Sequence, residues 1–158
     1  MGVLLIIGGS KGIGSALLAL EVENRAVINI SRTAPKIEHP NLTHYSLDVL
    51  NDELPTIEAL DGIVYCPGSI NLKPIGSLKM DDFKTDFEIN VLGAVRVIQH
   101  YFRKLKKGND PSIVLFSTVA VKRGMAFHAS VAAAKAGVEG ITKSLAAEFA
   151  PTIRVNCI

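Results

Sequence analysis

A glycine-rich run near the start of the chain has the spacing of a phosphate-binding loop. Gly8, Gly12 and Gly14 follow the apolar stretch Val3–Ile7 and open a stretch of helical periodicity. Glycine at these positions permits a tight turn and a close approach of the backbone to a pyrophosphate, and the helix start offers free N–H groups. The alternative is a turn that merely needs glycine. We expect cofactor contacts from Gly8, Ser10, Lys11, Gly12, Ile13 and Gly14.

The residues after the second apolar stretch indicate which dinucleotide this loop would bind. A carboxylate there accepts a hydrogen bond from the ribose 2′-OH of NAD, whereas a cation suits the 2′-phosphate of NADP. The chain has Ser31 and Arg32 at this place and no acid, and Lys11 lies where it could reach the same phosphate. Two cations and a hydroxyl suit a dianionic group, so we expect NADP (NADPH) as the cofactor. The alternative is that Arg32 and Lys11 are ordinary surface charges.

The glycine run resembles the loop of the short-chain dehydrogenase/reductase (SDR) family, which reads Thr-Gly-x-x-x-Gly-x-Gly. Ile7 replaces the leading threonine, and the resemblance extends over essentially the whole chain. It implies that Asp48 and Val49 hold the adenine ring, although a strand-end aspartate is also a common helix cap. In place of the family's Asn-Asn-Ala-Gly the chain has Tyr65–Gly68, and the retained Gly68 is expected beside the nicotinamide ribose.

The family's catalytic pattern is incomplete in this sequence. In the family a serine ends the fifth strand, a tyrosine follows thirteen residues later, and a lysine follows four residues after that. Counting back from Lys135 gives Val131 at the tyrosine position and Thr118 at the serine position. Threonine keeps a hydroxyl for a carbonyl substrate, but valine cannot give the proton that the tyrosine supplies during hydride transfer. Losing a general acid costs typically about 10²–10⁴-fold in rate.

Further residues are candidates for this site. Asn90 matches the family's helix asparagine, whose backbone carbonyl holds a water in a proton relay to the lysine; alternatively, its side chain bonds neighbouring backbone. His128 precedes Val131 by three residues and Lys135 by seven, so the three would share one face if the helix already includes His128. Histidine titrates near neutral pH and could donate the missing proton, and Ser130 is a second candidate. His128 could equally be a polar residue at a helix start, while Lys135 would hold cofactor ribose hydroxyls even without the tyrosine.

Two functions of different classes follow from these residues. The first is an NADP(H)-dependent oxidoreductase that transfers hydride between nicotinamide and a small carbonyl or alcohol substrate through an atypical active site. Its catalytic residues would be Asn90, Thr118, His128 and Lys135. The second is a catalytically silent NADP(H)-binding sensor or scaffold protein, which the valine at position 131 favours.

Apolar runs of strand length alternate with helical segments along the chain and must position these residues. Continuous apolar runs are typical of parallel strands buried on both faces. We predict strands at Val3–Ile7, Ala26–Ile30, Gly62–Cys66, Ile113–Phe116 and Ile153–Ile158, with a weaker one at Thr43–Leu47, and helices at Ile13–Glu23, Asp81–Lys106 and His128–Phe149. The prolines between the second and third strands predict a loop or a single turn there. This alternation predicts an α/β fold with a doubly wound parallel sheet, Rossmann-like and three-layered.

The composition excludes several other classes of protein. The chain has 158 residues, 17 Lys and Arg against 15 Asp and Glu, and 48% hydrophobic residues, which argues against disorder and against a nucleic-acid partner. Only two cysteines, Cys66 and Cys157, exclude a disulfide-stapled scaffold. The run Val3–Ile7 is too short for a membrane span and lacks the basic flank of a signal peptide. We therefore expect a cytoplasmic protein without a metal site.

The resemblance also sets expectations for assembly and extent. In the family, the helices matching Asp81–Lys106 and His128–Phe149 form a four-helix contact between subunits, which implies a homodimer or homotetramer. The final residues, Arg154–Ile158, correspond to the family's sixth strand, and a typical member continues through a substrate-binding loop. We therefore expect residues 1–158 to be an incomplete Rossmann-like dinucleotide-binding domain that lacks this substrate-loop portion.

Overall fold

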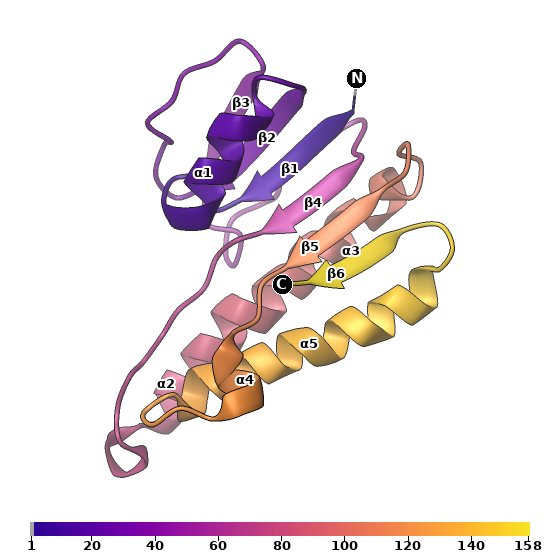
Figure 1. Ribbon diagram of the computed structural model, residues 1–158. Helices are drawn as coiled ribbons and strands as arrows, with labels where there is room; N and C mark the ends of the chain where they lie inside the picture. The colour runs from indigo at the N-terminus through magenta and orange to yellow at the C-terminus, as the bar shows by residue number, and fades with distance from the viewer. Residues whose placement is uncertain (1) are drawn as a thin grey trace.

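The centre of the protein is a six-stranded sheet in which every neighbouring pair of strands is parallel. A computed structural model describes residues 2–158. The strands are β1 (Val3–Ile7), β2 (Ala26–Ser31), β3 (Leu42–Ser46), β4 (Gly62–Tyr65), β5 (Ser112–Leu115) and β6 (Arg154–Cys157). Their spatial order is β3-β2-β1-β4-β5-β6 (Figure 1). This is the order of the doubly wound Rossmann fold, so the predicted fold class is confirmed.

The described helices are α1 (Gly12–Glu21), α2 (Met80–Phe87), α3 (Gly93–Leu105), α4 (Val119–Arg123) and α5 (Ala129–Phe149). A 3₁₀ turn, η1 (Ile75–Ser77), precedes α2, and a π-helical turn, η2 (Glu88–Leu92), joins α2 to α3. Among residues 2–158, no helix is long and apolar enough to cross a membrane.

Side chains of the central strands alternate between two apolar layers. In β1, Leu5 and Ile7 face a large core shared with α3 and α5, whereas Leu4 and Ile6 face a smaller core that includes Leu18 of α1. Successive side chains of a strand point to opposite faces of the sheet. A strand covered on both faces therefore reads as a continuous apolar run, which is why the sequence predicts β1 residue for residue.

The prediction of one regular helix over Asp81–Lys106 is wrong, because a π-helical turn interrupts it. The chain forms α2, then the π-turn η2 around Asn90, then α3, and the amide of Gly93 donates to the carbonyl of Glu88 five residues back. The apolar period continues through the π-turn, so the sequence pattern alone does not reveal it. Such turns occur frequently at functional sites. The short elements η1 and α4 were also not predicted, because three and five residues are too few to show a helical period.

The loops that follow the strands meet at one edge of the sheet. Because all strands are parallel, the carboxyl ends of β1, β2, β3 and β4 lie together, with β2 and β4 on opposite sides of β1. Ligands of open α/β sheets bind outside the carboxyl ends of the strands, at such a switch point. The connection from β2 to β3 contains no helix, as its prolines predict.

Candidate functional site

The glycine loop between β1 and α1 has a backbone shape that glycine adopts readily. Gly8 and Gly12 have φ angles of +83° and +55°, in the left-handed region that other residues enter at a cost. A Cβ on Gly14 would contact the carbonyl group of Gly8, whose carbon lies 2.9 Å from it. Among the described residues, no side chain caps the start of α1 at Lys11. The first helical amides are therefore free to bind an anion.

A pocket of about 240 Å³ lies at the carboxyl edge of the sheet beside this loop. Its walls come from the glycine loop, the end of β2, the turn after β3, the end of β4 and η2. Eight of the predicted cofactor-binding residues line it: Gly8, Ser10, Lys11, Ser31, Arg32, Asp48, Val49 and Gly68. Gly12, Ile13 and Gly14 form the adjoining start of α1. Residues 2–158 contain no cluster of three or more His, Cys, Asp or Glu side chains that could hold a metal ion.

The charged end of the pocket is formed by Arg32 and Lys11. Both side chains are exposed, and neither forms an ion pair with another described residue. The hydroxyl of Ser31 donates to the carbonyl of Thr33 at 2.8 Å, so its proton is already engaged. Ser31 therefore shapes the end of β2, while the two cations remain available to a phosphate.

Asn29 is a buried polar residue that the sequence analysis did not single out. Its Oδ1 accepts a hydrogen bond from the Gly9 amide at 2.9 Å, and its Nδ2 donates to Ser31 Oγ at 3.0 Å. The same Nδ2 lies 3.0 Å from Nδ1 of His44 on β3. One side chain thus joins the glycine loop to two strands. Asparagine is depleted in strands, and its presence in the apolar run of β2 is the signal that identifies it.

The turn after β3 is held from two directions. The carboxylate of Asp48 accepts from the amide of Leu50 at 3.0 Å within a turn. No helix begins there, so the alternative of a helix cap is not realised. The guanidinium of Arg96 in α3 donates to the carbonyls of Val49 and Asp52. The pocket wall formed by Asp48 and Val49 is therefore fixed to α3.

Lys135 reaches from α5 to the end of β5. Its Nζ donates to the carbonyl of Phe116 at 2.9 Å. Burial lowers the pKa of Lys135, because the ammonium loses water, and the Cys157 and Cys66 sulfurs oppose this effect. Burial raises the pKa of the Cys66 thiol to about 11, against the opposing charge of Lys135, so this thiol is neutral near pH 7.

Asn90 is buried in the π-turn η2, and its side chain is oriented by its neighbours. Its Nδ2 donates to the carbonyl of Asp86 at 2.8 Å and to Ser69 Oγ at 3.2 Å. The alternative in which this side chain bonds neighbouring backbone is thus realised. Its Oδ1 is buried and has no partner among the described residues. A Cβ built on Gly68 would lie 3.2 Å from this oxygen and 3.6 Å from Lys135 Nζ, so both groups face Gly68.

Thr118 and His128 lie in different hollows of the surface. Thr118 Oγ1 accepts from the amide of Ala120 at 3.3 Å, and the residue lines a hollow between α4, α5 and β6. His128 lines a hollow formed by segments 73–75 and 120–132. The structure therefore does not bring these two predicted catalytic residues into one cavity with the pocket beside the glycine loop. Val131, which counting back from Lys135 predicts at the tyrosine position, is 4% exposed.

The expectation that α5 includes His128 is wrong. The helix begins at Ala129, and His128 precedes it with a φ of −99° and a ψ of 12°. The imidazole ring instead bonds the loop, with Nδ1 2.7 Å from the carbonyl of Ala126. A carbonyl can only accept, so Nδ1 donates in this hydrogen bond and Nε2 is the nitrogen left for other contacts. Ser130, the second candidate donor, is buried, and its hydroxyl has no partner among the described residues.

Comparison with known proteins agrees with this architecture. Residues 48–158, most of the chain, match the sequence model of a family described as enoyl-(acyl carrier protein) reductase. The protein belongs to the short-chain dehydrogenase/reductase family. The predicted membership in this family is thereby confirmed.

Individual SDR relatives are distant in sequence and close in fold. The chain is 28% identical to L-xylulose reductase of Mesocricetus auratus over 167 residues, covering 98% of this chain and 68% of that protein. The aldohexose dehydrogenase of Thermoplasma acidophilum has a TM-score of 0.88 at 24% identity over 99% of this chain and 64% of its own. ElxO, solved with NADP bound, has a TM-score of 0.86 at 24% identity over 99% and 71%. The chain spans 60–68% of the length of the first three curated relatives.

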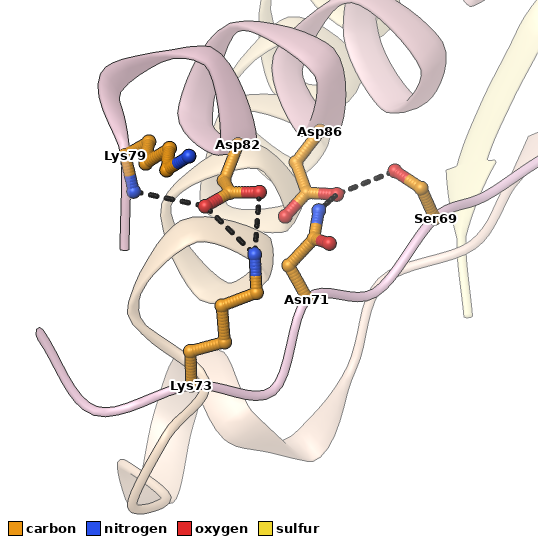
Figure 2. A network of polar contacts seen from close by, with 6 residues as sticks. All are labelled: Ser69, Asn71, Lys73, Lys79, Asp82 and Asp86. Atoms are coloured by element: carbon orange, nitrogen blue, oxygen red, sulfur yellow. Dashed lines mark hydrogen bonds and ion pairs between the residues drawn. The ribbon is translucent and has the colours of Figure 1, made fainter. Parts of the chain in front are cut away.

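In this SDR chain a polar network ties the segment after β4 to α2. Figure 2 shows Ser69, Asn71 and Lys73 on this segment, pointing toward two aspartates of the helix. Lys73 Nζ lies 2.9 and 3.0 Å from the carboxylate oxygens of Asp82, while Ser69 Oγ and Asn71 Nδ2 donate to Asp86 Oδ1 at 2.6 and 3.0 Å. This network is absent from the predictions made from the sequence. The four-residue spacing of the aspartates, which places them on one helix face, is the signal that could have found it.

Proposed function

We propose that the protein is an NADP(H)-dependent oxidoreductase that transfers a hydride between nicotinamide and a carbonyl or alcohol substrate. The observation that carries this proposal is the pocket beside the glycine loop, which two cations line and which adjoins the uncapped start of α1. Gly14 fits the close packing of α1 against the loop, because any Cβ there would meet the backbone of Gly8, whereas a Cβ on Gly12 would meet nothing within 4 Å. Family membership and relatives named as reductases and dehydrogenases support the same reaction class.

The preference for NADP over NAD rests on Arg32 and Lys11. Both are exposed and unpaired among the described residues, and β2 ends without the carboxylate that would select a ribose 2′-OH. Titration with NADPH and NADH, followed by nucleotide fluorescence, tests this choice. Arg32→Ala should weaken NADPH binding roughly tenfold, the loss of one charge-assisted hydrogen bond, and leave NADH binding unchanged. Arg103→Ala, an exposed arginine on α3, is the matched control; tighter binding of NADH than NADPH would contradict the proposal.

Catalysis would be divided among residues of α5 and of the segments before it. The nicotinamide supplies the hydride when bound. Lys135 would donate to ribose hydroxyls in place of its present bond to Phe116, since its Nζ faces Gly68 at the pocket. Thr118 would donate its hydroxyl to the substrate oxygen. His128, whose Nε2 is the uncommitted nitrogen, would give the proton that Val131 cannot.

The catalytic proposal is tested by NADPH consumption with a panel of carbonyl compounds at high protein concentration. His128→Ala should reduce turnover by at least about tenfold, within the range for a general acid. His100→Ala, which changes an exposed histidine on α3, controls for nonspecific effects. Unchanged turnover in the His128 variant would exclude this residue as the proton donor.

The second candidate function is that of a silent NADP(H)-binding sensor or scaffold. It is favoured by the buried Val131 and by the separation of Thr118 from His128 in different hollows. The substitution Val131→Tyr discriminates between the two functions. A gain in turnover of about tenfold or more would support a hydride-transfer site that lacks only its acid. Unchanged, absent turnover with retained NADPH binding would support the sensor or scaffold.

We also propose that the protein forms a homodimer through α2, α3 and α5. Phe87 and Leu92 are exposed apolar residues at the α2–α3 junction. A largely apolar hollow between α3 and α5 contains Phe102 and Phe149, whose rings stack with centroids 4.9 Å apart. Sedimentation equilibrium should give twice the chain mass, and Leu92→Asp should shift the protein toward the monomer. A monomer at all concentrations would contradict the proposal.

A further inference from the structure

Asp86 is a fully buried carboxylate that the proposed reaction does not use. Its side chain is 0% exposed, and both donors that reach it, Ser69 Oγ and Asn71 Nδ2, converge on the single oxygen Oδ1. The other oxygen, Oδ2, is buried without a partner among the described residues. A buried polar group is retained against its desolvation cost only where its bonds matter, so its position calls for an explanation.

The hydrogen bonds that Asp86 accepts have a fixed donor-to-acceptor direction. Asn71 contributes an amide nitrogen that can only donate, so Asp86 Oδ1 must accept. Ser69 Oγ accepts from Asn90 Nδ2 at 3.2 Å, and its own proton is given to Asp86 at 2.6 Å. The hydroxyl is therefore held with its lone pairs toward Asn90 and its proton toward the carboxylate.

This direction decides which end of the Asn90 amide faces Gly68, a residue that lines the pocket beside the glycine loop. Around Nδ2 lie two acceptors, Ser69 Oγ and the carbonyl of Asp86. If the Asn90 amide were flipped, its oxygen would face these two acceptors and would receive no hydrogen bond from them. Oδ1 is consequently directed to the opposite side, where it is buried, unpartnered, and faces Gly68 together with Lys135 Nζ.

We propose that Asp86 is a positioning residue that, through Ser69, fixes the Asn90 side-chain oxygen as an acceptor for a hydroxyl of the bound nucleotide. The Asn90 oxygen and the Lys135 ammonium both lie within 4 Å of the position of a Cβ on Gly68, so one hydroxyl placed there would donate to Asn90 and accept from Lys135. This role belongs to the Asn90 side chain and is separate from any role of its backbone carbonyl. The ligand part of the inference rests on the proposed function.

The first experiment measures NADPH affinity by fluorescence titration in four variants. Asp86→Leu and Ser69→Ala each break the series of hydrogen bonds from Asn90 through Ser69 to Asp86. Each should raise the Kd for NADPH roughly tenfold, the cost of one misdirected buried hydrogen bond. Asp86→Asn should stay within about twofold of wild type, because its Oδ1 can accept from the same two donors. Asp82→Leu is the matched control, since it removes an aspartate of α2 and frees the same segment without touching Asn90.

The outcomes distinguish an effect of hydrogen-bond direction from an effect of the Asp86 charge and from a general loosening of the segment after β4. Folded Asp86→Leu and Ser69→Ala proteins with wild-type affinity would overturn the proposal. An Asp86→Asn variant that loses as much affinity as Asp86→Leu would also overturn it, because the charge and not the direction would then matter. Equal loss in Asp82→Leu would reduce the effect to loosening of the segment. Ser69→Ala keeps every charge and serves if the leucine variant does not fold.

A second experiment needs no nucleotide. In protein labelled with ¹⁵N-asparagine, the side-chain amide protons of Asn90, assigned by their loss in Asn90→Ala, should exchange slowly with solvent. Asp86→Leu should speed this exchange at least about tenfold, while Asp86→Asn and Asp82→Leu leave it near wild type. Unchanged exchange in Asp86→Leu would overturn the positioning role. Wild-type protein that binds no nucleotide but shows this exchange pattern would refute the proposed function and leave the positioning role supported.

Discussion

The two ends of the candidate site are built from different parts of the chain. At the glycine loop, the site is made of backbone: the left-handed conformations of Gly8 and Gly12, the close contact at Gly14 and the free amides of α1. At the other end it is made of side chains, with Asn90 and Asp86 bonded to partners 15–21 residues away in sequence. A backbone site is encoded in the spacing of neighbouring residues, whereas a side-chain site exists only once distant segments have packed.

The largest effect is expected where the backbone site admits no side chain. Gly14→Ala places a Cβ against the carbonyl of Gly8 and must move the loop away from the helix start. Loss of two amide contacts to an anion, each worth about 1.5–3 kcal/mol, should weaken NADPH binding by roughly 100-fold or more. Fluorescence titration measures this loss. Gly76→Ala, where a Cβ meets nothing within 4 Å, should bind as wild type; equal affinity in the Gly14 variant would refute the backbone account.

A second steric effect is expected at Gly93, which lies at the end of the candidate site that is built from side chains. Gly93 follows the π-turn, and a Cβ there would meet the hydroxyl of Tyr65, which donates to the carbonyl of Ile89 at 2.7 Å. Gly93→Ala should therefore cost about 1–3 kcal/mol in the free energy of unfolding, as overpacked sites do. Urea denaturation measures this cost.

The partner of this contact supplies the control. In a Tyr65→Phe background the clashing oxygen is gone, so Gly93→Ala should cost less there, with a coupling energy of about 1 kcal/mol in the double-mutant cycle. Burial, assisted by the charge of Asp48, raises the pKa of Tyr65, which keeps the hydroxyl protonated as a donor to Ile89. Additive costs would show that Gly93 and Tyr65 do not interact as described.

Asn29 tests whether the backbone site also depends on a side chain. Asn29→Ala removes the acceptor of the Gly9 amide and should cost about 1–2 kcal/mol of stability, the penalty of one buried unsatisfied donor. NADPH affinity should fall several-fold, since the loop loses its anchor to β2. Asn24→Ala removes only a surface bond to Leu20 and is the matched control. Equal, small effects of both variants would mean that glycine spacing alone holds the loop.

These contrasts explain what the sequence predicts and what it does not. The run Val3–Ile7 and the glycines after it identify β1, the loop and the start of α1, because period and spacing are local properties. The π-turn at Asn90 leaves the apolar period unbroken, so the pattern reads as one helix. The prediction of His128 inside α5 failed at a helix boundary, where a single residue decides whether a side chain shares the helix face. The spacing of Asp82 and Asp86 marks one helix face, but the bond from Ser69 to Asp86 required the packed structure, since no spacing links residues 69 and 86.

The smallest effect is expected at the half-buried Asp82 of the α2 network, where protonation at low pH should release the ion pair with Lys73. The hydrogen bond from Lys73, and then that from the Lys79 amide, hold the pKa of Asp82 below its usual 3.8. A carboxylate with a lowered folded-state pKa stabilises the protein fully above its unfolded value, and this contribution is lost as the pH falls through the folded pKa. Thermal unfolding between pH 6 and pH 2 should therefore show Asp82→Asn less stable than wild type near neutral pH, with the difference closing below about pH 3.8. Asp81→Asn removes an equal charge from the same helix and leaves Lys73 paired. A difference between Asp82→Asn and wild type that persists unchanged at pH 2 would show that the ion pair with Lys73 is not the source of the stabilisation.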